Sequence, residues 1–182
     1  IAVFGVGGVG LNVIQGASLV NAYPIVAIDL HDKKLQQAKA FGATHTYVAT
    51  RADVEAALKA LTNGNGFDAT VDTTGNGQVR ELCYRLTSRT GKTILAGVPH
   101  HEERMTIDSF PIHFGRRLIG VHGGETKPDV DIPRYLALFR LGKLKLTEQM
   151  THHYRLEQVN EAIREVQEGR VGRCVIHMGS AR

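Results

Sequence analysis

Tryptophan is absent from the 182-residue sequence, aromatic residues make up only 6% of it, and cysteine occurs twice, at Cys83 and Cys174. Two cysteines are too few for a disulfide framework and cannot by themselves form a structural zinc site. We therefore expect buried, reduced thiols. No signal peptide precedes the first hydrophobic segment, so we expect a cytoplasmic location.

Long apolar runs are also missing, since none approaches the ~18 residues of a membrane span. The net charge of +4 reflects a small, scattered excess of basic residues, so we expect neither nucleic acid nor a membrane as partner. The hydrophobic fraction of 42% and the charged fraction of 22% are typical of a globular protein with an aliphatic core.

Short apolar segments alternate with segments of helical periodicity along residues 1–122. This pattern predicts βαβ units and a parallel sheet that is covered on both faces. We therefore expect an α/β fold with a doubly wound, six-stranded parallel sheet. The expected strands are 1–6, 25–30, 45–49, 67–73, 92–98 and 118–122.

Residues 123–182 follow a different pattern, with an extended segment at 152–156, an amphipathic helix and a last strand at 174–178. This segment is too small to form a domain by itself. The sequence also begins at Ile1 inside a strand pattern. We therefore expect the chain to be a piece of a longer protein.

The strongest chemical signal is a glycine-rich turn, Gly5-Val6-Gly7-Gly8-Val9-Gly10, between a strand pattern and a helix pattern. An acidic residue, Asp29, ends the next strand about 20 residues later. This combination is the dinucleotide-binding fingerprint of a Rossmann sheet. Gly5 permits the tight turn, Gly7 lets a pyrophosphate approach the backbone, and Gly10 lets the helix pack closely. The helix N-terminus then attracts the phosphates.

Asp29 also predicts which dinucleotide is bound. A carboxylate there accepts hydrogen bonds from the adenine ribose hydroxyls and repels a 2′-phosphate. Leu30 and His31 supply no arginine that would reverse this preference, and Lys33 and Lys34 would do so only partly. We therefore expect NAD rather than NADP.

Several segments resemble the zinc-dependent medium-chain alcohol dehydrogenases, namely 3–11, 26–29, 39–44, 97–99 and 172–176, in that order along nearly the whole chain. The resemblance implies that residues 1–122 are the NAD-binding Rossmann domain. It implies that residues 123–182 return to a catalytic domain that the sequence lacks. The parent protein would transfer hydride between an alcohol or aldehyde carbon and nicotinamide C4.

The resemblance further implies a set of residues that contact the cofactor. These residues are Gly5, Gly7, Gly8, Val9 and Gly10 at the phosphates, Asp29 and Lys34 at the adenine ribose, Thr73 and Thr74 after the fourth strand, Ala96, Gly97 and Val98 along the nicotinamide, and Arg173 at the pyrophosphate.

The zinc ligands and proton-relay residues of that family lie upstream of the glycine turn, so the resemblance implies that zinc belongs to the parent protein and has no ligands here. The adjacent pairs His100-His101 and His152-His153 are poor chelates because neighbouring side chains diverge on a strand. We therefore expect no catalytic residue in this chain, which alone should bind NAD and catalyse nothing.

Residues 105–110 look like an edge strand with apolar content, and Ile112 follows Pro111 directly. The resemblance implies that the edge Met105–Ile112 pairs with its copy in a homodimer or tetramer. The alternative is a lid that packs on its own domain.

Two other functions remain open from the sequence. A stand-alone NAD-binding or redox-sensing module would share the glycine turn and lack catalysis. A methyltransferase with a nucleoside cofactor would share the acidic residue, although the closely spaced third glycine, Gly10, and the segment Gly97-Val98-Pro99 argue against it.

Overall fold

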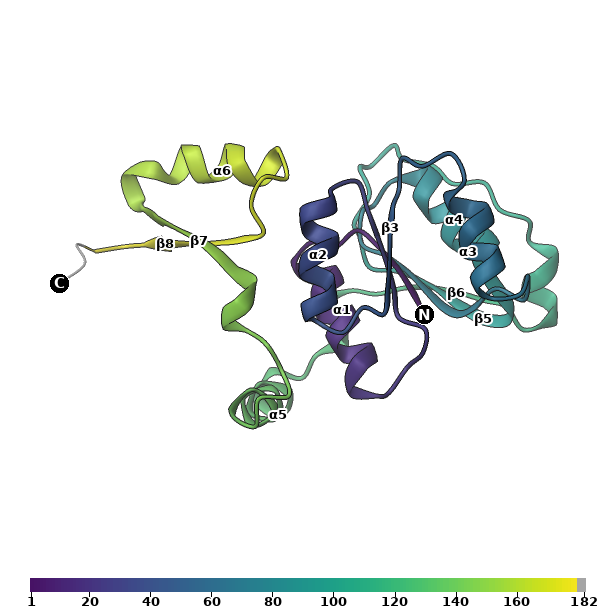
Figure 1. Ribbon diagram of the computed structural model, residues 1–182, viewed down its shortest axis with the longest axis horizontal. Helices are drawn as coiled ribbons and strands as arrows, with labels where there is room; N and C mark the ends of the chain where they lie inside the picture. Colours follow the sequence, from purple (N-terminus) through teal and green to yellow (C-terminus); the bar gives the residue numbers. More distant parts are fainter. Residues whose placement is uncertain (180–182) are drawn as a thin grey trace. The chain divides into compact units, whose positions relative to one another are not determined.

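A computed structural model describes residues 1–179 of the chain. The chain divides between Lys127 and Pro128 into two compact units. The first unit contains a six-stranded sheet, and the second contains a two-stranded sheet (Figure 1). Among the described residues, no helix combines the length and the apolar character needed to cross a membrane.

The sheet of the first unit is parallel throughout and has the order β3-β2-β1-β4-β5-β6. The expected doubly wound, six-stranded α/β fold is therefore confirmed. The strand order reverses between β1 and β4, and ligands of such sheets bind at this point. The strands are β1 (Ala2–Phe4), β2 (Val26–Asp29), β3 (His45–Val48), β4 (Phe67–Asp72), β5 (Thr87–Leu95) and β6 (Arg117–Gly120).

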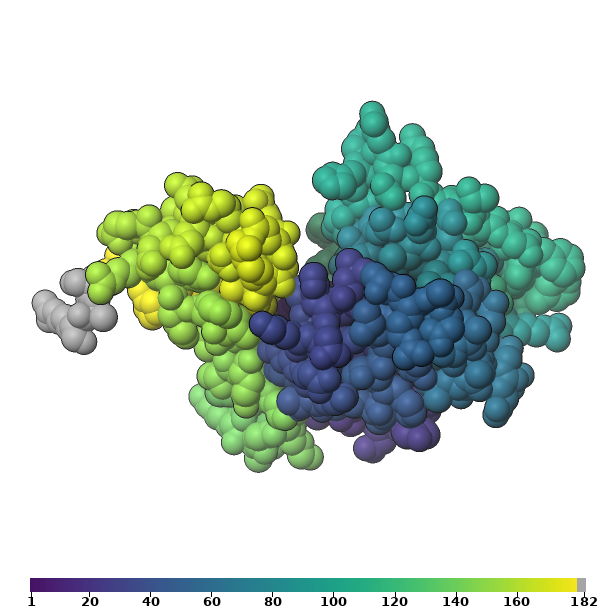
Figure 2. All heavy atoms as spheres, turned by 45° about the horizontal axis from the view of Figure 1, so that its top comes forward, coloured from purple at the N-terminus to yellow at the C-terminus, as the bar shows by residue number. Residues whose placement is uncertain are grey.

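Helices cover both faces of this sheet, with α1 and α2 on one face and α3 and α4 on the other (Figure 1). Successive strand residues point to opposite faces. Val3 of β1 accordingly packs with Leu11 and Leu35, whereas its neighbour Phe4 packs with Leu58 and Cys83. The helices are α1 (Gly8–Leu19), α2 (Asp32–Ala40), α3 (Val54–Leu61) and α4 (Gly77–Leu86). Figure 2 shows the purple, blue and teal atoms of this unit as one closely packed body.

The edge strand expected at residues 105–110 is wrong. Residues 103–109 form neither helix nor strand, the 3-10 helix η1 (Phe110–Phe114) follows, and β6 is the edge of the sheet. Side chains of α4 bind this backbone instead: Glu81 accepts from Thr106 N at 2.7 Å, and Tyr84 Oη donates to Asp108 O at 2.8 Å. These bonds replace a strand ladder, and Asp108 starts the turn by accepting from Phe110 N.

The second unit contains two parallel strands that are joined by a helix. Helix α6 packs on β8 and buries Ala162, while Ile163 and Val166 of the same helix are half-exposed. The elements are α5 (Pro128–Arg140), β7 (Met150–Arg155), α6 (Val159–Gln167) and β8 (Arg173–His177), with short 3-10 helices η3 (Thr147–Gln149) and η4 (Leu156–Gln158) between them, while η2 (Gly123–Glu125) follows β6 in the first unit.

Candidate functional site

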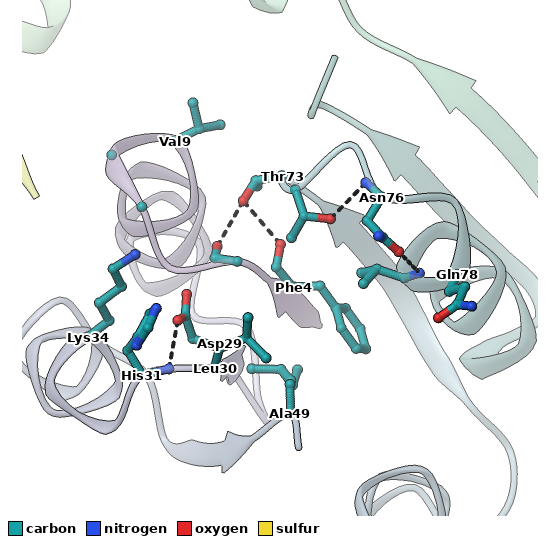
Figure 3. A pocket seen from close by; sticks show the side chains of 16 residues that line it. Phe4, Val9, Asp29, Leu30, His31, Lys34, Ala49, Thr73, Asn76 and Gln78 are labelled. Atoms are coloured by element: carbon teal, nitrogen blue, oxygen red, sulfur yellow. Dashed lines mark hydrogen bonds between the residues drawn. The ribbon is translucent and has the colours of Figure 1, made fainter. Parts of the chain in front are cut away.

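A cleft of about 650 Å³ lies at the carboxyl ends of β1, β2 and β4, where the strand order reverses. Most of the residues expected at a cofactor line it (Figure 3). The lining residues are Phe4, Gly5, Gly7, Gly8, Val9, Ile28, Asp29, Leu30, His31, Lys34, Ala49, Thr73, Thr74, Asn76, Gln78 and Val79.

The turn from β1 into α1 is closely packed against the end of β4. Gly5 has a φ of +86°, which favours glycine, and a Cβ there would lie 2.5 Å from Thr73 Oγ1. A Cβ on Gly10 would overlap the carbonyl oxygen of Gly5. Thr73 Oγ1 lies 3.0 Å from Phe4 O and 2.9 Å from Gly5 O, and its single hydroxyl proton is shared between these two acceptors. Gly5 therefore allows the turn, and Gly10 allows the close packing of the helix.

The middle glycine of the turn faces open space. A Cβ on Gly7 would meet no atom within 4 Å, and no side chain caps the N-terminus of α1. The first helical turn also carries no acidic residue. Unpaired N–H groups and the positive end of the helix dipole at such a terminus favour an anion. The cleft thus has room and charge for a phosphate at Gly7.

Asp29 lies at the wall of the cleft and is 8% exposed. Its Oδ2 accepts from Val6 N at 2.7 Å, and its Oδ1 accepts from His31 N at 3.0 Å. The carboxylate thereby holds the glycine turn against the end of β2. Each oxygen keeps capacity to accept a further hydrogen bond. Lys34 and His31 lie on the same side of the cleft, as Figure 3 shows.

The structure brings the expected residues together only in part. Gly10 lies behind the lining, packed on Gly5. The segment Ala96 to Val98 follows β5 outside the lining, with Val98 85% exposed. Arg173 belongs to β8 of the second unit. For all the expected residues, those that line the cleft included, contact with a cofactor stays a prediction.

Some residues that line the cleft were not predicted from the sequence, because most of them have no distinctive chemistry. Phe4, Ile28 and Ala49 are small or apolar residues at or beside strand ends, and Val79 lies in the first turn of α4. Asn76 caps that helix by accepting from Val79 N at 3.1 Å. Only their position, at or near the carboxyl ends of neighbouring strands, could have indicated from the sequence that these residues line the cleft.

The described residues, 1–179, include no group of three or more His, Cys, Asp or Glu side chains that could hold a metal ion. His153 of β7 and His177 of β8 lie side by side, with Nδ1 and Nε2 2.9 Å apart, but two histidines alone are too few. A zinc site takes four ligands, or three and a water. This part of the chain therefore does not fit zinc.

Cys83 is expected to be unreactive in the folded protein. It is fully buried on α4, and burial together with the Asp72 carboxylate raises the pKa of its thiol far above the ordinary value. The thiolate is the reacting species, so a disulfide reagent at neutral pH should modify Cys174 and reach Cys83 only after unfolding. In a Cys174→Ser control no thiol should react until urea is added. Rapid reaction of that variant under native conditions would contradict the prediction.

Comparisons with known proteins agree with this geometry. A family model described as zinc-binding dehydrogenase matches residues 8–140. Alcohol dehydrogenase 2 from Zea mays is 31% identical, and an S-(hydroxymethyl)glutathione dehydrogenase from Aspergillus oryzae is 34% identical, each over 98% of this chain. The chain spans about half the length of these relatives, 48% and 47% respectively.

A solved structure of benzyl alcohol dehydrogenase from Acinetobacter calcoaceticus superposes with a TM-score of 0.91 at 25% identity. The match covers 98% of this chain and 49% of that protein. The glycine turn, the acidic residue at the end of β2 and the sheet order are those of a dinucleotide-binding fold, and the family model covers most of the chain. The chain therefore belongs to the zinc-binding dehydrogenase family.

Proposed function

We propose that the chain is the NAD-binding part of a zinc-dependent dehydrogenase that acts on an alcohol or an aldehyde. The observation that carries this proposal is the combination at the β1/β4 reversal. Gly7 is open to a ligand, the N-terminus of α1 has no side-chain cap, and Asp29 stands in the same cleft. These features suit a phosphate beside a ribose, which a dinucleotide supplies.

Each part of the cleft has a separate task in this proposal. The N-terminus of α1 binds the pyrophosphate, and Asp29 and Lys34 bind the adenine ribose. Thr73 and Thr74 line the opposite side of the cleft, toward the nicotinamide half. When bound, NAD would accept or donate the hydride at its nicotinamide C4.

The substrate site and the zinc ligands belong to the remainder of the parent protein in this proposal. Two relatives are named for alcohols and one for a glutathione adduct, and all of them are about twice as long as this chain. The alternative is a stand-alone NAD-binding or redox-sensing module. In either case the chain by itself should have no zinc-dependent activity, because its described residues include no group that could hold a metal ion.

Calorimetric titration tests the cofactor assignment. The chain should bind NAD and leave S-adenosylmethionine unbound. Gly7→Ala should weaken NAD at least tenfold, because the new methyl group occupies the open space beside the helix N-terminus. The same substitution should leave the unfolding midpoint nearly unchanged, since the methyl group meets no protein atom within 4 Å.

Opposite results would reject parts of the proposal separately. Binding of S-adenosylmethionine instead of NAD would favour a methyltransferase. Unchanged NAD affinity in Gly7→Ala would place the phosphates elsewhere. Zinc-dependent oxidation of alcohols by residues 1–182 alone would show that the catalytic site is not upstream.

We also propose a cytoplasmic homodimer or tetramer. The expected contact, Met105–Ile112, lacks a strand, but β6 is an open sheet edge, and Phe110, Ile112 and Phe114 beside it are exposed. An open edge and an apolar patch both favour a partner. Sedimentation velocity checks the oligomeric state, and a monomer at micromolar concentration would contradict the proposed dimer or tetramer.

A further inference from the structure

A buried ion pair lies beneath the cleft and takes no part in the site described so far. Asp72, the last residue of β4, is fully buried, and Arg80 of α4 is 8% exposed. Arg80 Nε donates to Asp72 Oδ2 at 3.2 Å. Buried charges are unfavourable unless they are paired and fully hydrogen-bonded, so the surroundings of this pair indicate what it does.

Asp72 holds the loop that follows its own strand. Its Oδ1 accepts from Thr74 N at 2.8 Å and from Thr74 Oγ1 at 2.6 Å, and its Oδ2 accepts from Gly75 N at 3.1 Å. Thr74 lines the cleft, as does Thr73 beside it. The buried carboxylate thus fixes one wall of the cleft from below.

Arg80 connects this loop to the next one. While Nε binds Asp72, Nη2 donates to Gly97 O at 2.7 Å, in the loop after β5. The two loops touch: a Cβ on Gly97 would lie 2.7 Å from the Thr73 carbonyl carbon and 2.8 Å from Thr74 N. Because the guanidinium is a planar fork, it can reach two acceptors on different loops at once.

The position of these loops relative to Asp29 decides which half of a dinucleotide they face. β2, which carries Asp29, lies on one side of β1, and β4 and β5 lie on the other. If the adenine ribose binds at Asp29 and the phosphates at α1, the remaining half of the molecule extends toward the loops after β4 and β5.

We propose that Arg80 is a positioning residue that sets the spacing of these two loops and so holds the nicotinamide half of the cofactor. The inference rests on the proposed NAD-binding function. Arg80 contacts no cofactor atom in this proposal. It acts through Asp72, the Thr73–Gly75 loop and the carbonyl of Gly97.

Arg80→Lys tests the proposal because it keeps a cation for Asp72 and removes the second arm of the fork. We expect NAD affinity to fall about fivefold, the factor for one lost hydrogen bond. The affinity for ADP-ribose, which lacks nicotinamide, should change less than twofold. The emission of bound NADH, which reports the surroundings of the ring, should shift toward that of free NADH.

The matched control is Arg85→Lys on the same helix. Arg85 is half-exposed and pairs with Glu55 at 3.2 Å. It should alter neither ligand affinity nor NADH emission. If Arg80→Lys fails to fold, Asp72→Asn combined with Arg80→Met removes both buried charges together and carries the same expectation.

The possible results distinguish a failure of the positioning role of Arg80 from a failure of the proposed NAD-binding function. Equal weakening of NAD and ADP-ribose, or no change in either, would overturn the positioning role and leave NAD binding intact. Equal affinity of the unmodified chain for NAD and ADP-ribose would do the same. Failure of the unmodified chain to bind either ligand would reject the proposed function, and the inference with it.

Discussion

Replacing Gly10 by alanine is expected to lower the free energy of unfolding by about 3 kcal/mol, the upper range for overpacking. The new Cβ would overlap the carbonyl oxygen of Gly5, a backbone atom that cannot rotate away. Thr73 Oγ1 also holds that oxygen by donating to it at 2.9 Å. Relief therefore requires α1 to move away from β1, and the thermal midpoint should fall by about 6–12 °C.

A second glycine in the same helix provides the control. A Cβ on Gly16 of α1 would meet no atom within 4 Å. Gly16→Ala should therefore raise stability by up to about 1 kcal/mol, through the lower conformational entropy of the unfolded chain. The two alanine variants should shift the midpoint in opposite directions. A midpoint of Gly10→Ala equal to that of the unmodified chain would contradict the close packing of α1 on the turn.

Asp29→Asn is expected to abolish most of the preference for NAD over NADP. The neutral amide loses charge-assisted hydrogen bonds to the ribose hydroxyls, so NAD should bind tenfold or more weakly, on the order of 1.5–3 kcal/mol. Repulsion of a 2′-phosphate disappears at the same time. The ratio of the two dissociation constants, measured by calorimetry, should therefore fall further than the NAD affinity itself.

This ratio also separates a loss of recognition from a loss of structure. Asp29 accepts from Val6 N and His31 N, so its replacement also loosens the glycine turn. A loosened turn would weaken NAD and NADP alike. Asp32→Asn, an exposed change in the first turn of α2, should leave the ratio unchanged. An equal fall of both affinities in Asp29→Asn would refute the assignment of Asp29 to the ribose.

The parts of the site that sequence predicted are those whose chemistry is local. Gly5, Gly7 and Gly10 lie within one turn, and Asp29 follows at a spacing fixed by one helix and one strand. Each residue type is required by the backbone conformation or by the bound phosphate, so the pattern can be recognised from the sequence. The alternation of strands and helices likewise predicted the sheet, since each strand needs apolar cover on both faces.

The prediction of an edge strand at residues 105–110 was wrong because strand formation also depends on partners that are distant in the sequence. Its apolar residues suit a strand, but pairing depends on which groups are available to the backbone N–H and C=O. Glu81 and Tyr84 of α4 take two of them, and Asp108 bends the chain into η1. Glu81 and Tyr84 are each more than 20 residues away in sequence from the backbone groups that they bind, so local propensity could not reveal these contacts.

Local patterning therefore suffices for the strand and helix order, the glycine turn and the acidic residue at the end of β2, because each depends on neighbours a few residues away. Only the folded chain pairs Asp72 with Arg80 and carries the second arm of Arg80 to Gly97. These groups come from β4, α4 and the loop after β5, and no spacing rule links them. They meet because parallel strands end at the same edge of the sheet, where a buried charge must find its partners within the fold.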